Sequence, residues 1–131
     1  MRVVFDTNVF VSALVFPGGD GERAVQRVID GHDHLLVSYA IVGELLAVLA
    51  RKFARDREEL ARVAVFVAGI AETIEPSVSI AVLADEPDNR ILECALAGGA
   101  ELIVTGDKEM LALGDHEGVR IVRLGEYLEP G

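Results

Sequence analysis

Two acidic residues in this chain come just after short apolar runs, one near each end of the sequence. In "RVVFDTNVF" the run Val3 to Phe5 leads into Asp6, and in "ELIVTGDKEML" the run Leu102 to Val104 leads to Asp107. Apolar runs of this length are typical of buried strands. Carboxylates that follow two such strands can share one crevice, and their oxygens suit a hard cation such as Mg²⁺ or Mn²⁺.

Two further acids could join this pair. Glu44 interrupts the apolar stretch "YAIVGELLAVLA", and helical spacing places it beside the apolar face, so we do not expect it to point into free solvent. Asp88 lies in "DEPDN", in the expected first turn of a helix, where an acid also favours the helix dipole. Asp85 and Glu86 are expected to serve that dipole, but spacing alone does not separate Asp88 from Asp85.

A cluster of carboxylates without an opposing charge is destabilised by mutual repulsion, which a divalent cation relieves. Such an ion keeps waters, bridges to phosphates, activates a water and stabilises charge on a phosphoryl oxygen. The chain has one cysteine, Cys94, and its three histidines show no ligand-type spacing, so we expect neither a disulfide nor a cysteine-based zinc site. The acids therefore indicate metal-assisted chemistry on phosphate groups.

Strands and helices that could position these acids alternate along the chain. Strands are expected at Val3 to Phe5, Leu35 to Val37, "TIEP", Leu102 to Val104 and Val119 to Val122. Helices are expected at Asn8 to Val15, Glu22 to Asp30, Tyr39 to Phe53, Arg57 to Ala71, "DEPDN" to about Ala97 and Lys108 to Leu113, followed by a short tail helix. Ser38 and Asp56 are placed to cap two of these helices.

This alternation predicts an α/β protein with a parallel sheet covered on both faces. The chain of 131 residues contains no linker or internal repeat, so we expect a single domain, residues 1–131. Ligands of such sheets bind beyond the carboxyl ends of the strands, where the strand order reverses. If the first and fourth strands are neighbours, Asp6 and Asp107 share that crevice.

Composition limits the possible partners and compartments. A net charge of −10 argues against binding nucleic acid by overall attraction, but not against a local basic strip or a metal. No apolar run approaches a membrane span, and no signal peptide is visible, so we expect a cytoplasmic protein with no membrane partner.

The quoted segments resemble a PIN domain, and most of all the small bacterial PIN proteins proposed as VapC-type toxins of toxin–antitoxin pairs. The resemblance rests on "FDTNVF", "GEL" in the third long helix, "DEPDN" and "IVTGDKEML", which occur in order over nearly the whole chain. It implies a three-layer α/β/α sandwich with a central parallel sheet of about five strands. It also implies a Mg²⁺- or Mn²⁺-dependent endoribonuclease, with an antitoxin protein as a possible partner.

The resemblance also assigns roles to individual residues. The four acids of the family, which hold the metal and catalyse, match Asp6, Glu44, Asp88 and Asp107. Polar residues near the family's site match Asn8, Ser12 and Thr105. The match favours Asp88 over Asp85, a choice that spacing left open. Because no member of the acidic set is missing, we expect an active enzyme.

Two expectations concern surfaces. The strip "RKFARDREELAR" places Arg51 and Arg55 on the stripe of Glu44, where they could contact RNA, although a solvated helix face is the alternative. Proteins of this family usually pair, so we expect a homodimer through apolar residues of the following helix. These residues are Val63, Val65, Phe66, Val67 and Ile70, and the alternative is that all of them face the sheet of their own subunit.

Other functions remain to be weighed. A haloacid-dehalogenase-like phosphatase begins with a strand that ends in Asp-x-Asp, but "DTN" supplies an asparagine at the second acidic position. A receiver domain would need an acidic pair after the first strand, which is also missing. An RNA-processing PIN nuclease without an antitoxin and a non-catalytic RNA- or protein-binding module stay open. No residue pattern identifies which RNA would be cut.

Overall fold

Six strands form one sheet in the computed structural model of this chain, which describes residues 1–129, and their order is β3-β2-β1-β4-β6-β5. Their bounds are Arg2–Phe5 (β1), His34–Val37 (β2), Ala71–Thr73 (β3), Leu102–Val104 (β4), Asp115–His116 (β5) and Val119–Val122 (β6). Every neighbouring pair is parallel except β5 and β6. The fold is therefore α/β with a mostly parallel sheet, as the sequence predicted.

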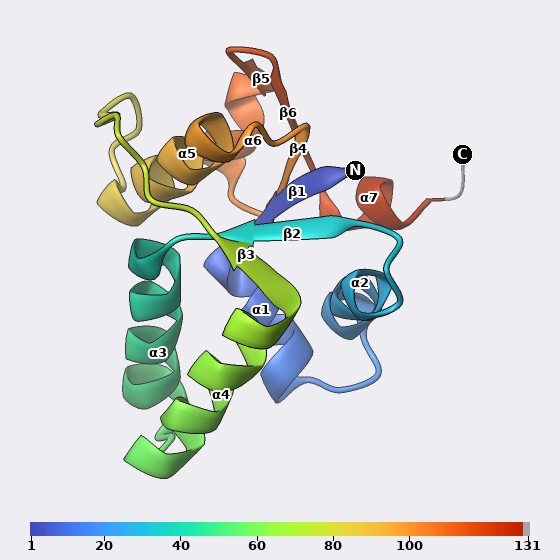
Figure 1. The fold of residues 1–131 in the computed structure, drawn as a ribbon, viewed down its shortest axis with the longest axis vertical. Helices are drawn as coiled ribbons and strands as arrows, with labels where there is room; N and C mark the ends of the chain where they lie inside the picture. The colour runs from blue at the N-terminus through green and yellow to red at the C-terminus, as the bar shows by residue number, and fades with distance from the viewer. Residues whose placement is uncertain (130–131) are drawn as a thin grey trace.

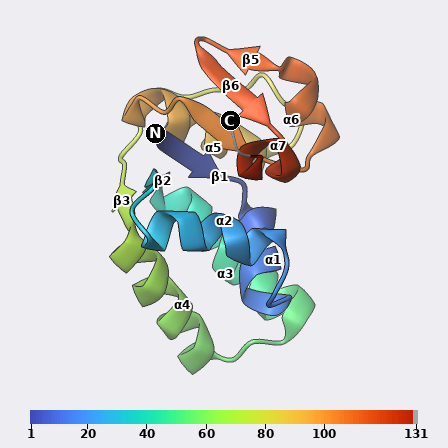
Figure 2. The same cartoon turned by 90° about the vertical axis from the view of Figure 1, so that its right-hand side faces the viewer.

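Seven helices within the described residues complete the fold. They are Thr7–Val15 (α1), Asp20–Ile29 (α2), Tyr39–Phe53 (α3), Arg57–Ile70 (α4), Glu86–Gly98 (α5), Lys108–Leu113 (α6) and Leu124–Leu128 (α7). Helix α5 packs on one face of the sheet against β1, β2 and β4, whereas α1, α2 and α3 lie on the other face (Figures 1 and 2). This arrangement gives the expected three layers. In residues 1–129 none of the helices is long and apolar enough to cross a membrane.

The strand order creates the crevice that the sequence predicted. Strand β1, the first in the chain, lies between β2 and β4, with Val4 paired to Leu36 on one side and to Ile103 on the other. All three side chains are fully buried, as expected for strands covered on both faces. The carboxyl ends of β1 and β4 therefore lie side by side, and they point toward the side of the molecule where α3 and α5 begin (Figure 1).

Local hydrogen bonds and one glycine set the ends of three helices. The Ser38 hydroxyl accepts from the Ile41 N–H at 3.3 Å and caps α3 as predicted. Asp56 and Glu59 form a reciprocal capping box at the start of α4. Helix α5 ends at Gly99, whose φ of +66° is a left-handed conformation that glycine adopts without strain.

Two strand predictions were wrong in detail. The third strand is Ala71–Thr73 and not "TIEP", because the chain becomes extended at the residue after α4 and pairs at once with β2. Strand β5 was not predicted, since Asp115 and His116 are too few residues to show an alternating pattern. The sheet therefore has one antiparallel edge strand in addition to the five expected strands.

Candidate active site

Asp6, directly after β1, is held by hydrogen bonds of its backbone and of its side chain. Its N–H donates to the Val104 carbonyl of β4 at 2.9 Å. Its Oδ2 accepts from the Thr105 hydroxyl at 2.6 Å, and its Oδ1 accepts from the Asn8 N–H at 3.3 Å, where α1 begins. These bonds fix the orientation of the buried side chain at the carboxyl end of β1.

Thr105 connects this acid to the end of β4. The residue is fully buried, and while its hydroxyl donates to Asp6, its oxygen accepts from the Asp107 N–H at 3.0 Å. Asp107 in turn caps α6, because its Oδ2 accepts from the Met110 N–H at 2.8 Å. The two strand ends that carry Asp6 and Asp107 are thus joined through one threonine.

Three of the four predicted acids line one pocket, which we call the acidic pocket and whose volume is about 260 Å³. Asp6 comes from the end of β1, Glu44 from α3 and Asp88 from the first turn of α5. The complete lining is Asp6, Thr7, Asn8, Glu44, Val48, Arg51, Lys52, Asp85, Pro87, Asp88 and Ile91. The fold therefore brings together acids that lie far apart in the sequence.

The electrostatics of the site show that the acids at the strand ends and in the first turn of α5 influence one another. Burial and, after it, the negative charges of Asp6, Asp107, Asp85 and Glu109 raise the pKa of Asp88 from 3.8 to about 7. Burial also raises the pKa of Asp6, although its hydrogen bond from Thr105 opposes this change. The part of these shifts that comes from repulsion between acids is the part that a bound cation would relieve.

Asp107 lies beside the pocket and not in its lining. Its charge still raises the pKa of both Asp6 and Asp88, so the fourth acid acts on the same site. Within residues 1–129 no three His, Cys, Asp or Glu side chains already gather closely enough to hold a metal ion. Three of the four carboxylate oxygens of Asp6 and Asp107 instead accept hydrogen bonds from the chain itself.

Two basic residues, both from α3, are part of the pocket lining. Arg51 and Lys52, in the last turn of α3, are exposed and line it, and neither forms an ion pair with another described residue. Arg55 was expected beside Arg51, but it bonds to Glu59 at 3.2 Å and lines a different pocket against α4. The chain turns at Ala54, whose left-handed φ of 52° ends α3, and this turn separates Arg55 from the basic residues before it.

The structure also revises the placement of Ser12 and Asp85. Ser12 faces α2, where a Cβ on Gly21 would come within 2.7 Å of it, and it is not part of the pocket lining. Asp85 occupies the N-cap position of α5, but its side chain accepts no capping hydrogen bond and instead lines the acidic pocket. The expectation that Asp85 serves only the helix dipole therefore missed its place in the pocket lining.

Sequence reasoning did not assign Lys52, Thr7 or Asp85 to the site. Lys52 stands eight positions after Glu44, a spacing close to two helical turns, so helical periodicity could have found it. Thr7 follows Asp6 directly and is buried at the start of α1. No sequence signal distinguished an exposed acid that caps α5 from one that faces the pocket.

Comparisons with solved structures agree with the fold described above. Residues of this chain superpose on VapBC2 from Rickettsia felis, solved with a DNA fragment from its promoter, with a TM-score of 0.67 at 14% identity over 94% of this chain and 98% of that one. VapC20 of Mycobacterium tuberculosis, described as a toxin that cleaves the sarcin–ricin loop, matches with a TM-score of 0.59 at 17% identity over 90% of this chain and 98% of that one. Identities this low show a shared fold.

Sequence comparison gives the family. An uncharacterised protein of Methanocaldococcus jannaschii, MJ1680, is 29% identical over 119 residues, which are 88% of this chain and 76% of that protein. The sequence profile of the PIN domain matches residues 2–109, a span that begins with β1 and passes through every acid of the pocket to Asp107. With its fold, its strand-end acids and this match in agreement, the chain belongs to the PIN domain family.

Proposed function

We propose that this protein is an endoribonuclease that hydrolyses RNA phosphodiester bonds with Mg²⁺ or Mn²⁺, and that it is the toxin of a toxin–antitoxin pair. The observation that carries the proposal is the acidic pocket, where Asp6, Glu44 and Asp88 converge and Asp107 adds its charge. The membership of the PIN domain family supports the same activity.

The residues of the pocket fit a hard divalent cation. The donors are carboxylate oxygens, which Mg²⁺ and Mn²⁺ prefer over nitrogen and sulfur. None of Asp6, Glu44, Asp88 and Asp107 is paired with a basic side chain among the described residues, so their charges have no internal compensation. A bound Mg²⁺ or Mn²⁺ ion would supply an activated water and stabilise negative charge on a phosphoryl oxygen.

The chain contributes orientation and proton control. Thr105 and the Asn8 N–H hold the carboxylate of Asp6, so this acid does not rotate freely at the mouth of the sheet. Asp88, with a pKa of about 7, carries a proton in much of the metal-free protein at neutral pH and must release it to act as a ligand. Glu44 lines the same pocket from α3.

RNA would approach along the end of α3. Arg51 and Lys52 present two cations at the rim of the acidic pocket and are suited to contact the phosphates that flank the cleaved bond. Arg55 is less suited, because Glu59 neutralises it. A bound RNA would therefore be positioned by local charge, although the chain as a whole carries −10.

Two protein partners belong to the proposal. The structural relative VapBC2 is named as a VapBC complex, which supports an antitoxin partner for this chain. A homodimer through α4 is supported by exposed apolar side chains, since Val65 is 74% and Phe66 38% exposed. Val67 is fully buried and belongs to the core of its own subunit, so only part of the expected face is available.

A cleavage assay tests the activity. The purified protein should cut a structured RNA pool in the presence of Mn²⁺, and EDTA should stop the reaction. The variant Asp6→Asn, purified in the same way, should lose most of the activity, whereas Asp20→Asn on exposed α2 should keep it. Full activity in Asp6→Asn would refute the proposed site. RNA binding without cleavage in the wild type would favour a non-catalytic binding module.

The toxin role has its own test. A short reading frame beside this gene, with a DNA-binding start and a disordered tail, should encode a protein that binds this chain and suppresses its activity. If no adjacent protein binds the chain, and the nuclease matures a defined RNA, an RNA-processing PIN nuclease would replace the toxin.

A further inference from the structure

A twelve-residue segment without helix or strand connects β3 to α5 and delivers Asp85 and Asp88 to the acidic pocket. We call residues 74–85 the connecting arm. Most of its side chains are exposed, among them Val78 and Val82 at 49% and 58%. A segment this open has few apolar contacts of its own, so specific hydrogen bonds must set its path.

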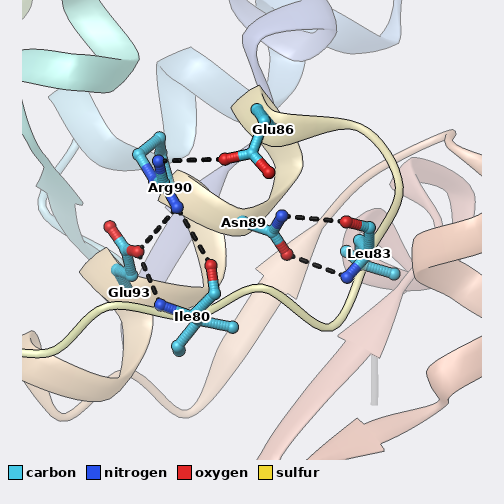
Figure 3. Close-up of polar contacts among 6 residues, drawn as sticks. All are labelled: Ile80, Leu83, Glu86, Asn89, Arg90 and Glu93. Carbon is cyan, nitrogen blue, oxygen red and sulfur yellow. Dashed lines mark hydrogen bonds and ion pairs between the residues drawn. The ribbon is translucent and has the colours of Figure 1, made fainter.

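Asn89, one residue after Asp88, makes the two most buried of these bonds. Its Nδ2 donates to the Leu83 carbonyl at 2.9 Å, and its Oδ1 accepts from the Leu83 N–H at 2.9 Å (Figure 3). The amide thus pairs with both backbone groups of one residue, as a neighbouring strand would. Asn89 is completely buried, so water does not compete for these bonds.

A second group of hydrogen bonds and ion pairs fixes the connecting arm one helical turn further along α5. Glu93 accepts from the Ile80 N–H at 2.8 Å and pairs with Arg90 at 2.8 Å, while Arg90 donates to the Ile80 carbonyl at 2.9 Å (Figure 3). Arg90 also bonds to Glu86 in the first turn at 3.3 Å. Both backbone groups of Ile80 are therefore bound to the same helix that carries Asp88.

These bonds oppose a repulsion that the pocket itself creates. Asp88 is buried near Asp85, Asp6 and Asp107, and the charges of all three act on it. The first turn of α5 lacks the usual protection, because its N-cap residue Asp85 makes no side-chain capping bond. Each of these acids suits the helix N-terminus by itself, but the repulsion between them favours a movement of Asp85 and Asp88 away from the pocket.

We propose that Asn89 is a positioning residue of the acidic pocket, which holds Leu83 against α5 and so keeps Asp85 and Asp88 facing Asp6. Leu83 and Asn89 bracket the two acids, so their bonds close a short loop that contains both. Arg90 and Glu93 support the same path from Ile80. This inference rests on the proposed metal-dependent nuclease.

The test compares Asn89→Ala with a variant that loses comparable buried hydrogen bonds elsewhere. Asp33→Ala serves this purpose, since Asp33 bonds to Arg27 and Tyr127 near α2 and α7, outside the acidic pocket. Both variants should melt at lower temperature. Only Asn89→Ala should weaken Mn²⁺ binding to the folded protein, by about 10-fold or more, as measured by calorimetric titration well below the melting midpoint.

Hydrogen exchange separates this inference from the proposed function. In metal-free Asn89→Ala, the backbone amides of residues 83–89, apart from Pro87, should exchange at least about 10 times faster than in the wild type, and in Asp33→Ala they should not. Unchanged exchange there, or wild-type Mn²⁺ affinity in folded Asn89→Ala, would overturn the inference. If the wild type itself bound no Mn²⁺, the proposed function would fail. The hydrogen-exchange comparison alone would then decide whether Asn89 holds Leu83 against α5. Asn89→Ser replaces Asn89→Ala if the latter does not fold.

Discussion

Asp88 is the residue whose charge depends most on the rest of the site. Buried in the first turn of α5 and surrounded by other acids, it has a pKa of about 7, far above the usual 3.8. The folded chain therefore binds more protons than the unfolded chain between these two pH values. By linkage, the free energy of unfolding falls as pH rises through this window, and the full loss is present above about pH 7.

Removing this charge should flatten that dependence. We expect metal-free Asp88→Asn to lose less stability than the wild type between pH 5 and pH 8, and to melt at a higher temperature at pH 8, because its amide cannot ionise. The measurement is thermal unfolding in a chelating buffer across this pH range. Asp20→Asn, on the exposed surface of α2, should follow the wild type. If Asp88→Asn lost as much stability as the wild type, Asp88 would not be the strained acid.

At the level of residues, sequence reasoning could predict a side chain's place where that place follows from its position in a strand or helix. Asp6 and Asp107 could be predicted to lie at the same edge of the sheet, because buried strands are readable from apolar runs. Glu44 was assigned to the site only by the resemblance to PIN domains, since helical periodicity indicated no more than a position beside the apolar face. The role of Asp85 could not be predicted, since an acid at an N-cap position is expected to accept a backbone N–H, and only the side-chain rotamer shows that this one does not. Asn89 carried no signal at all, because its partner belongs to an irregular segment.

At the level of elements, the last turn of α3 determines how RNA would meet the pocket. A helix C-terminus carries a partial negative charge that stabilises basic residues near it, and Arg51 and Lys52 occupy this turn. Exposed and without ion pairs among the described residues, they keep their charge available for phosphate. We therefore expect RNA to contact the last turn of α3, and not the whole basic strip "RKFARDREELAR".

Replacing both cations should change the salt dependence of binding. In an Asp6→Asn background that does not cleave, Arg51→Ala/Lys52→Ala should lower the slope of log affinity against log salt by roughly one to two. The matched control is Arg55→Ala/Arg62→Ala, which removes the same charge from residues paired with Glu59 and Glu58. Filter binding or fluorescence anisotropy at several salt concentrations measures both. An equal change in the two double variants would mean that only net charge matters.

Most elements could be predicted because their signals are local. The bounds of α3, α6, β4 and β6 agree with the predicted ranges, since apolar periodicity, capping residues and turn glycines all indicate the same limits. Strand β3 was displaced because its residues, Ala71–Thr73, are mostly exposed at a sheet edge and show no apolar run. Edge pairing depends on the neighbouring strand, which a local pattern does not describe.

At the level of the whole molecule, α4 is the least covered helix. Only Val67 is fully buried, while Val65 and Phe66 are exposed beside it. Phe66 also borders an apolar pocket of about 180 Å³ between α1 and α2. Apolar side chains gathered in this way favour contact with another protein surface.

We therefore expect a dimer in solution. Light scattering at high micromolar concentration should give twice the mass of the chain, and Val65→Asp/Phe66→Asp should shift the protein to a monomer because it places charge on the shared face. Arg57→Asp/Glu58→Lys, at the exposed start of the same helix, is the control and should leave the mass unchanged. A monomer mass for the wild type would exclude the dimer.

The central claim is that acids from β1, α3, α5 and the end of β4 form one divalent-cation site. Metal-free protein should carry a repulsion that Mn²⁺ relieves by binding the folded chain. At about 100 times Kd, this binding adds roughly 2.7 kcal/mol to the free energy of unfolding. For a chain of this size the melting midpoint should rise by about 10 °C.

The measurement is the melting midpoint of the wild type and of single acid variants, with and without millimolar Mn²⁺ at neutral pH. We predict a clear rise for the wild type, a much smaller rise for Asp6→Asn and Asp88→Asn, and an intermediate rise for Asp85→Asn, whose carboxylate lines the pocket. Asp20→Asn should respond as the wild type does. A wild-type midpoint that does not move with Mn²⁺ would contradict the site.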